Sequence, residues 1–213
     1  MKITNLESIY PKYKYLAPSW RTNLWQIVVR VETDLGFFGL GCGGGGNSAV
    51  EIVNSHFREL LTGRTIDSME DIHSTWEMLY KASIPYGRKG IAIMALSGVD
   101  LALWDLLAKA QSVPVYELLG GLKKERVRAY ATGRDTDKSG RNTERYRDLG
   151  FTAYKLPHRW TGVDSDYEEA VEYTTRARHL FGREALIMVD SYMSWDESVT
   201  AKMASLLSEL DIY

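Results

Sequence analysis

The residue best placed to do chemistry is Asp190, which directly follows the apolar run of residues 185–189. We expect that run to form a buried strand, so its terminal carboxylate would emerge at the carboxyl edge of a sheet, where α/β active sites lie. Lys155 lies near the end of the preceding predicted strand and should reach the same edge. A carboxylate suits a hard divalent cation, and an ammonium can hold a substrate carboxylate. The alternative for Asp190 is a structural role in capping the next turn, and the pattern alone favours neither.

A second pattern is rich in glycine. Gly39, Gly41 and Gly44 match G-x-G-x-x-G between a predicted strand and a predicted helix. In dinucleotide-binding folds such glycines let a pyrophosphate approach a helix N-terminus. That fold also needs a further strand ending in an acidic residue, whereas the sequence after Leu61 continues into another predicted helix. We therefore interpret residues 42–47 as a mobile loop, because consecutive glycines are entropically unfavourable in regular structure.

Composition argues against several classes of function. The 213 residues include 26 Lys and Arg against 28 Asp and Glu, and no basic run is long enough to follow a nucleic-acid backbone. The first residues lack the apolar core of a signal peptide. The sequence also contains no run of about 18 consecutive apolar residues, which a membrane span would need. The single cysteine, Cys42, allows no internal disulfide, which suits a reducing cytoplasm. We expect a cytoplasmic protein without nucleic-acid or membrane partners.

The elements before residue 125 predict an α+β unit. Residues 24–33 are rich in β-branched side chains and, with residues 37–40, predict a hairpin. Helical patterns follow, and the last is apolar nearly all round, which predicts a buried helix. Pro114 and the glycine pair after Leu119 then break the pattern and mark a domain boundary. The predicted helices span about residues 48–61, 69–81 and 90–111.

After that boundary, strands alternate with helices. Apolar strands in such an alternation indicate a parallel sheet covered on both faces. Capping-box sequences at Ser165 and Ser194 predict the starts of two helices, and residues 211–213 predict the start of a fourth strand. The pattern fits the start of a (β/α) barrel and of an open doubly wound sheet equally well. The three predicted strands are residues 127–130, 151–156 and 185–189.

One long segment resembles a signature of the mandelate racemase/muconate lactonizing branch of the enolase superfamily. It reads ALSGVDLALWDLLAK at residues 95–109 and continues as PVYELLG at residues 114–120. Shorter segments resemble those of rhamnonate dehydratases, and the similarity extends over essentially the whole chain, most weakly before residue 24 and from 134 to 148. These segments read YGRKG at 86–90, YATG at 130–133, KLP at 155–157 and DSYMS at 190–194.

The resemblance implies an α+β capping domain over residues 1–125, followed by the first part of a modified (β/α) TIM-type barrel. Residues 126–213 would hold the first three βα units and stop at the fourth strand. Metal ligands in this family end the third, fourth and fifth barrel strands, so Asp190 would be the first ligand of a Mg²⁺ ion. The other two ligands and a histidine acid/base are expected beyond Tyr213. Taken alone, the 213 residues are therefore expected to be inactive.

The activity implied by the resemblance is that of a hydro-lyase. It would dehydrate a small sugar acid, such as a rhamnonate-like aldonate, to a 2-keto-3-deoxy acid through an enediolate, as a homo-oligomer. Many racemases of this branch carry Lys-x-Lys on the second barrel strand, with the second lysine as a base. Pro157 stands in that position here and cannot take a proton, which favours a dehydratase. There are two alternatives. One is an epimerase or racemase, and the other is a non-catalytic capping-domain protein that binds or assembles.

Three residues are candidates for contacting the sugar acid. Lys155 would contact the substrate carboxylate, and a direct catalytic role is its alternative. Arg21 belongs to an early loop, residues 11–23, which would close over the sugar together with residues 42–47. His158 follows the second barrel strand and would reach the rim. Ordinary surface or packing roles are the alternatives for Arg21 and His158.

Overall fold

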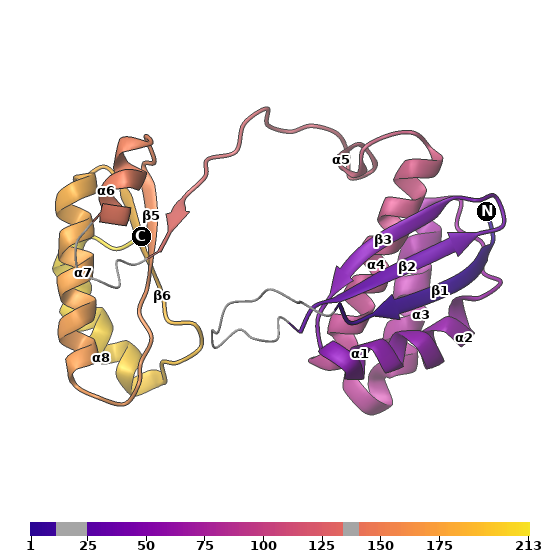
Figure 1. The fold of residues 1–213 in the computed structure, drawn as a ribbon, viewed down its shortest axis with the longest axis horizontal. Coiled ribbons are helices and arrows are strands. Elements are labelled where there is room, and N and C mark those ends of the chain that lie inside the picture. The colour runs from indigo at the N-terminus through magenta and orange to yellow at the C-terminus, as the bar shows by residue number, and fades with distance from the viewer. Residues whose placement is uncertain (12–24, 134–140) are drawn as a thin grey trace. The chain divides into compact units, whose positions relative to one another are not determined.

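The computed structural model describes residues 1–11, 25–133 and 141–213. The chain divides into two compact units, Met1–Lys123 and Lys124–Tyr213 (Figure 1). Each unit has its own cluster of buried apolar side chains. The boundary predicted between residues 125 and 126 lies two residues from this division.

The first unit contains a three-stranded antiparallel sheet with the strand order β1-β2-β3. Alternate side chains of β2 are buried, as expected for a strand with one face on the core. β2 and β3 pair from Ile27 with Gly43 to Glu32 with Phe38, which confirms the predicted hairpin. The strands span Ile3–Ile9 (β1), Ile27–Thr33 (β2) and Phe38–Gly43 (β3).

Helices lie against one face of this sheet (Figure 1). α1, the π-helical turn η1 and α2 follow one another directly, and α3 begins with a capping box between Ser68 and Asp71. The helices span Gly46–Ile52 (α1), Val53–Phe57 (η1), Arg58–Leu61 (α2), Met69–Gly87 (α3), Ile91–Ala110 (α4) and Val115–Leu118 (α5).

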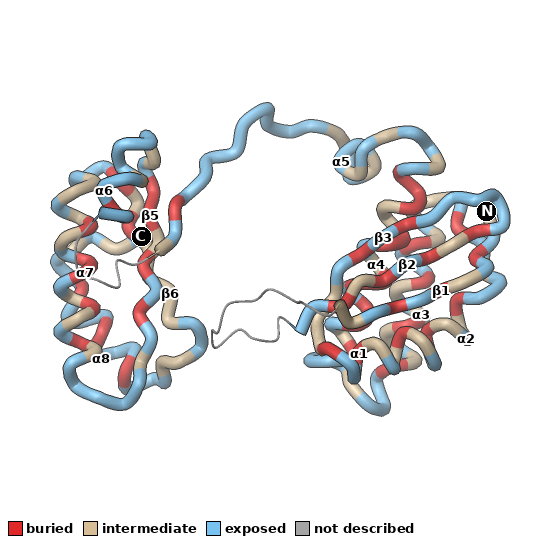
Figure 2. The backbone as a smooth tube through the Cα atoms, viewed as in Figure 1, coloured by how far each residue is buried: buried red, intermediate tan, exposed pale blue. Residues whose placement is uncertain are grey.

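α4 is the central helix of the first unit. Figure 2 shows buried stretches along α4 and the strands of the sheet. By length and composition alone, α4 could cross a membrane, yet 61% of its apolar window is buried inside the unit. That burial is what a core helix requires, and it confirms the prediction of a largely buried helix.

The glycines of β3 let that strand lie directly on the backbone of α4. At each of three alternate positions, a Cβ would fall within 2.5 Å of a helix carbonyl oxygen. Since alternate residues of a strand face the same side, the three glycines form one flat stripe. The loop predicted at residues 42–47 is shorter in the structure, because Gly43 ends β3 and Gly46 begins α1, which leaves Gly44 and Gly45 between them. The contacts pair Gly39 with Ala102 (1.9 Å), Gly41 with Gly98 (2.1 Å) and Gly43 with Met94 (2.5 Å).

The second unit contains three parallel strands in the order β4-β5-β6. Ile212 forms an isolated parallel bridge with Ile187 of β6, which confirms the predicted start of a fourth strand. The strands span Ala131–Thr132 (β4), Ala153–Pro157 (β5) and Leu186–Asp190 (β6). The helices span Arg141–Asp148 (α6), Ser165–Phe181 (α7), Glu197–Leu207 (α8) and the 3-10 turn Ser208–Leu210 (η2).

Within this unit, the described residues cover only one face of the parallel sheet. Tyr154, Leu156 and Ile187 pack with α7 in the buried cluster. Lys155 and Pro157 alternate with them along β5, so their side chains project from the opposite face, where they are partly or fully exposed. The prediction of a sheet covered on both faces therefore holds for one face in the described part of this unit.

Both predicted helices form, but neither has the predicted serine cap. α7 begins at Ser165 itself with Asp164 as its N-cap residue, and no side chain caps it. α8 begins later than predicted, because the Asp196 carboxylate accepts the Val199 N–H and so provides the cap in place of Ser194.

Candidate functional site

Lys155 and Asp190 meet at the carboxyl edge of the parallel sheet. β5 and β6 pair from Ala153 with Leu186 to Pro157 with Asp190, so the two strands end side by side. The Lys155 Nζ atom lies 2.9 Å from Asp190 Oδ2. The two side chains that the sequence predicts at one edge therefore form an ion pair there.

The Asp190 carboxylate accepts hydrogen bonds from two donors. Lys155 reaches Oδ2, and the Tyr192 backbone N–H donates to Oδ1 at 2.9 Å. The hydrogen bond from Lys155, and then that from Tyr192, hold the pKa of Asp190 below its ordinary value. The same carboxylate raises the pKa of Lys155, so both groups are charged near neutral pH. Because the two side chains are 26% and 38% exposed, a ligand can reach them.

Tyr130 and Thr132 lie next to Lys155. The Lys155 Nζ atom lies 5.3 Å from the centroid of the Tyr130 ring. Thr132 pairs with Lys155 in the ladder between β4 and β5, and its hydroxyl donates to the Lys155 carbonyl oxygen at 3.2 Å. Sequence reasoning missed Tyr130, although its position two residues before Thr132 was a signal that it shares that face of the sheet.

The His158 side chain faces away from this pair, although its backbone N–H donates to the Asp190 carbonyl oxygen at 2.9 Å. The His158 side chain is 2% exposed, and its Nε2 atom lies 2.9 Å from Thr174 Oγ1 on α7. His158 alternates with Pro157 and therefore faces the helix side of the sheet. This position gives no support to the predicted substrate contact, and we interpret His158 as a packing residue. Arg21 lies outside the described residues.

The described residues offer one carboxylate at this edge whose chemistry suits Mg²⁺, that of Asp190. Carboxylate oxygens such as those of Asp190 are the donors that Mg²⁺ prefers. Within residues 1–11, 25–133 and 141–213, however, no three His, Cys, Asp or Glu side chains gather closely enough to hold a metal ion. Asp190 fits the chemistry of a ligand, but the described residues do not form a complete metal site.

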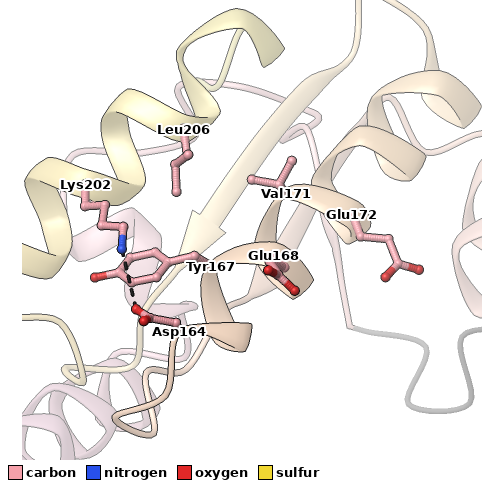
Figure 3. Close-up of a pocket in the computed structure, with 7 residues that line it drawn as sticks. All are labelled: Asp164, Tyr167, Glu168, Val171, Glu172, Lys202 and Leu206. Carbon is pink, nitrogen blue, oxygen red and sulfur yellow. Dashed lines mark hydrogen bonds and ion pairs between the residues drawn. The ribbon is translucent and has the colours of Figure 1, made fainter.

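A hollow of about 540 Å³ lies between α7 and α8 (Figure 3). Lys202 reaches across it, with its Nζ atom 3.9 Å from the centroid of the Tyr167 ring and 3.5 Å from Asp164 Oδ1. Neither Lys155 nor Asp190 lines this hollow, and we assign it no part in the site. Its lining residues are Asp164, Tyr167, Glu168, Val171, Glu172, Lys202 and Leu206.

Comparison with known sequences places the first unit in a family. Residues 17–120 match the family described as "Mandelate racemase / muconate lactonizing enzyme, N-terminal domain". A protein of Caldivirga maquilingensis that carries the provisional name L-rhamnonate dehydratase is 38% identical over 209 residues. That alignment covers 97% of this chain and 49% of the relative.

Solved structures match both units. The L-rhamnonate dehydratase of Gibberella zeae is 31% identical with a TM-score of 0.80, over 99% of this chain and 56% of that chain. The rhamnonate dehydratase of Gibberella zeae has also been solved in complex with Mg. A racemase from Streptomyces coelicolor A3(2) with bound magnesium is 30% identical with a TM-score of 0.74, over 88% of this chain and 56% of that chain.

The chain spans about half the length of these relatives. The antiparallel α+β unit corresponds to the capping domain of the enolase superfamily, and the parallel strands correspond to the first part of its barrel. Residues 17–120 thus match the N-terminal domain of the mandelate racemase/muconate lactonizing enzyme family, and the chain is similar to L-rhamnonate dehydratases.

Proposed function

We propose that the whole protein dehydrates a small sugar acid, a rhamnonate-like aldonate, to a 2-keto-3-deoxy acid with Mg²⁺ as its cofactor. Two relatives, 38% and 31% identical to this chain, carry the name of L-rhamnonate dehydratase. The observation that carries the proposal is the contact of 2.9 Å between Lys155 and Asp190 at the carboxyl edge of the sheet. Active sites of (β/α) barrels lie at that edge.

Each of the two residues has a role in this proposal. Asp190 supplies one of the oxygen ligands of Mg²⁺, and the remaining ligands come from other parts of the whole protein. When bound, Mg²⁺ stabilises the negative charge that develops when a proton is lost next to the substrate carboxylate. Lys155 binds that carboxylate through its partly exposed ammonium group, and Tyr130 limits the directions in which the ammonium can turn.

A racemase or epimerase is the second candidate. The racemase structure from Streptomyces coelicolor is 30% identical to this chain. The position two residues after Lys155, where many racemases of this branch carry a second lysine, is Pro157. Because proline has no side-chain base, this strand offers no second proton acceptor, and the dehydratase is favoured.

The setting of the reaction is part of the proposal. We expect a homo-oligomer in the cytoplasm that acts on a small-molecule acid. Cys42 is free and exposed, which suits a reducing compartment.

The test is turnover by the full-length protein with Mg²⁺ against a panel of aldonic and aldaric acids that includes rhamnonate. We expect a 2-keto-3-deoxy product from one acid, lost in EDTA and restored by Mg²⁺. Asp190→Asn should abolish turnover and weaken Mn²⁺ binding. Asp164→Asn, which changes a carboxylate that is 92% exposed in the same unit, is the matched control and should do neither. Epimerised product without loss of water would support the second candidate.

The proposal fails if no acid is turned over and Asp190→Asn leaves metal binding unchanged. That result would favour the third reading, in which the chain binds or assembles without catalysing a reaction.

A further inference from the structure

The four residues after Asp190 form a turn in an unfavourable backbone conformation. The Ser194 N–H donates to the Ser191 carbonyl oxygen at 3.1 Å, which closes a β-turn. Its central residues, Tyr192 and Met193, have φ angles of 48° and 62°. Two successive positive φ angles are the mark of the I′ class, whose usual residues are Asn, Asp and Gly. A Cβ at both positions makes this conformation sterically costly.

The Met193 side chain is too exposed for its packing to offset that cost. The Tyr192 and Met193 side chains are 44% and 89% exposed. Hydrogen bonds hold the turn: the Tyr192 N–H donates to Asp190 Oδ1 at 2.9 Å, and Ser194 Oγ donates to the Ser191 carbonyl oxygen at 2.6 Å. The same Ser194 Oγ accepts the Trp160 N–H at 2.8 Å. Since Trp160 follows β5, Ser194 joins the segments that follow the strands bearing Lys155 and Asp190.

We infer that residues 191–194 are a positioning turn, which uses its strained backbone to fix the orientation of the Asp190 carboxylate. An aspartate at a strand end can rotate its carboxylate between two equivalent orientations. The Tyr192 N–H holds Oδ1 and thereby directs Oδ2 towards the Lys155 side of the edge. Backbone strain of this kind is concentrated at functional sites, and ligand orientation by such partners tunes metal affinity. The inference rests on the proposed role of Asp190 as a metal ligand and adds the residues that position it.

Substitutions at Met193 test the inference, because its side chain is exposed and contributes little packing. Met193→Gly adopts positive φ without steric cost, Met193→Ala keeps the Cβ, and Met193→Val adds a β-branch that opposes positive φ most strongly. In the full-length protein, we expect the Mn²⁺ dissociation constant to be unchanged or lower for the Gly variant. It should stay within about twofold for Ala and rise about tenfold for Val.

The measurement is Mn²⁺ titration followed by electron paramagnetic resonance, well below the thermal midpoint of every variant. A turn with only a structural role would lower the thermal midpoint of Met193→Val and leave its Mn²⁺ affinity within twofold of wild type, and that result would overturn the inference. Weaker Mn²⁺ binding by Met193→Gly would also contradict it.

Asp190→Asn in the same assay distinguishes failure of the positioning turn from failure of the proposed metal role of Asp190. If Asp190→Asn abolishes Mn²⁺ binding and the Met193 series has no effect, only the positioning turn is wrong. If Asp190→Asn leaves Mn²⁺ binding unchanged, the proposed metal role fails and the inference falls with it.

Discussion

At the scale of single residues, an ammonium and a carboxylate in contact keep each other charged at the sheet edge. Lys155 pairs in register with Met188, two positions before Asp190, so its side chain must extend along the strand to reach the carboxylate. Two residues of strand are about 6.6 Å, which is within the reach of an extended lysine. The ion pair therefore depends on the length of lysine and on the register of β5 with β6.

Lys155→Met should weaken substrate binding more than it slows chemistry. Removing a charge-assisted hydrogen bond costs about 1.5–3 kcal/mol, so KM for the sugar acid should rise roughly 10- to 100-fold with a smaller change in kcat. Steady-state kinetics of the full-length protein measures this. Lys202→Met, which removes an ammonium from the hollow between α7 and α8, is the control and should leave KM unchanged. A fall in kcat with unchanged KM would instead indicate direct catalysis by Lys155.

The same pair predicts pH dependence of stability only at the extremes. Because the pKa of Asp190 is lowered, its charged carboxylate stabilises the fold above the ordinary aspartate pKa. This stabilisation is lost as pH falls through the lowered pKa. Because the pKa of Lys155 is raised, its charged ammonium stabilises the fold below the ordinary lysine pKa. This stabilisation is lost as pH rises through the raised pKa. The difference in thermal midpoint between wild type and Lys155→Met, measured in EDTA, should be constant from about pH 5 to 9. It should shrink below about pH 4, and a change near pH 7 would point to another group.

At the scale of elements, the close approach of β3 and α4 fixes the first unit. The glycine stripe lets the strand touch the helix backbone, and Asp105 Oδ2 of α4 accepts the Leu40 N–H of β3 at 2.7 Å. β3 is an edge strand of its sheet, so the helix carboxylate satisfies a donor that would otherwise be open to solvent. The signature segment of α4 is therefore explained by packing, with Asp105 in a structural role.

Gly41→Ala should strongly destabilise the first unit. The added Cβ would lie 2.1 Å from the Gly98 carbonyl oxygen and 2.6 Å from the Ala102 nitrogen, and backbone atoms of a buried helix cannot move aside easily. We expect a loss of about 3 kcal/mol in the free energy of unfolding, measured by urea denaturation. Gly44→Ala is the matched control, because its nearest neighbour is the flexible Met94 side chain at 3.2 Å, and it should cost less than about 1 kcal/mol. Equal effects of the two substitutions would contradict this account.

These elements also show which features can be read from sequence. The hairpin of β2 and β3, the buried helix α4 and the parallel strands follow from local periodicity, which is written in neighbouring residues. The packing role of the glycines at 39–43 cannot be predicted from neighbouring residues, because the helix that they contact lies more than 50 residues later in the chain. Likewise, Ser194 has a typical capping sequence, but its hydroxyl is engaged by Ser191 and Trp160, and only the folded chain brings Trp160 to it.

The candidate site divides in the same way. The position of Asp190 at the end of an apolar strand could be predicted, because strand ends are visible in the sequence. The face of the sheet from which the His158 side chain projects could not be predicted. It depends on where β5 begins its alternation and on Thr174 of α7. The register that brings Lys155 to Asp190 likewise arises only when β5 and β6 pair.

At the scale of the whole molecule, each unit is organised around its own core. The first unit buries apolar side chains from its sheet, α3 and α4, whereas the second buries a smaller set between β5, β6 and α7. The second unit carries Lys155 and Asp190 on the face that its own helices leave uncovered. A pair in that position needs further groups on the same face before it can bind a metal and a substrate together.

This requirement predicts that residues 1–213, produced as a separate polypeptide, are inactive. A single carboxylate holds Mg²⁺ or Mn²⁺ weakly, and the described residues offer no cluster of three metal-binding side chains. We expect no sugar-acid turnover and a Mn²⁺ dissociation constant above about 1 mM, against much tighter binding by the full-length protein. Circular dichroism of the same sample must show folded helices, so that lost binding is not a consequence of unfolding. Turnover by the 213-residue polypeptide would mean that it contains the acid/base group and the metal ligands, and Lys155 would then become the first residue to test as a base.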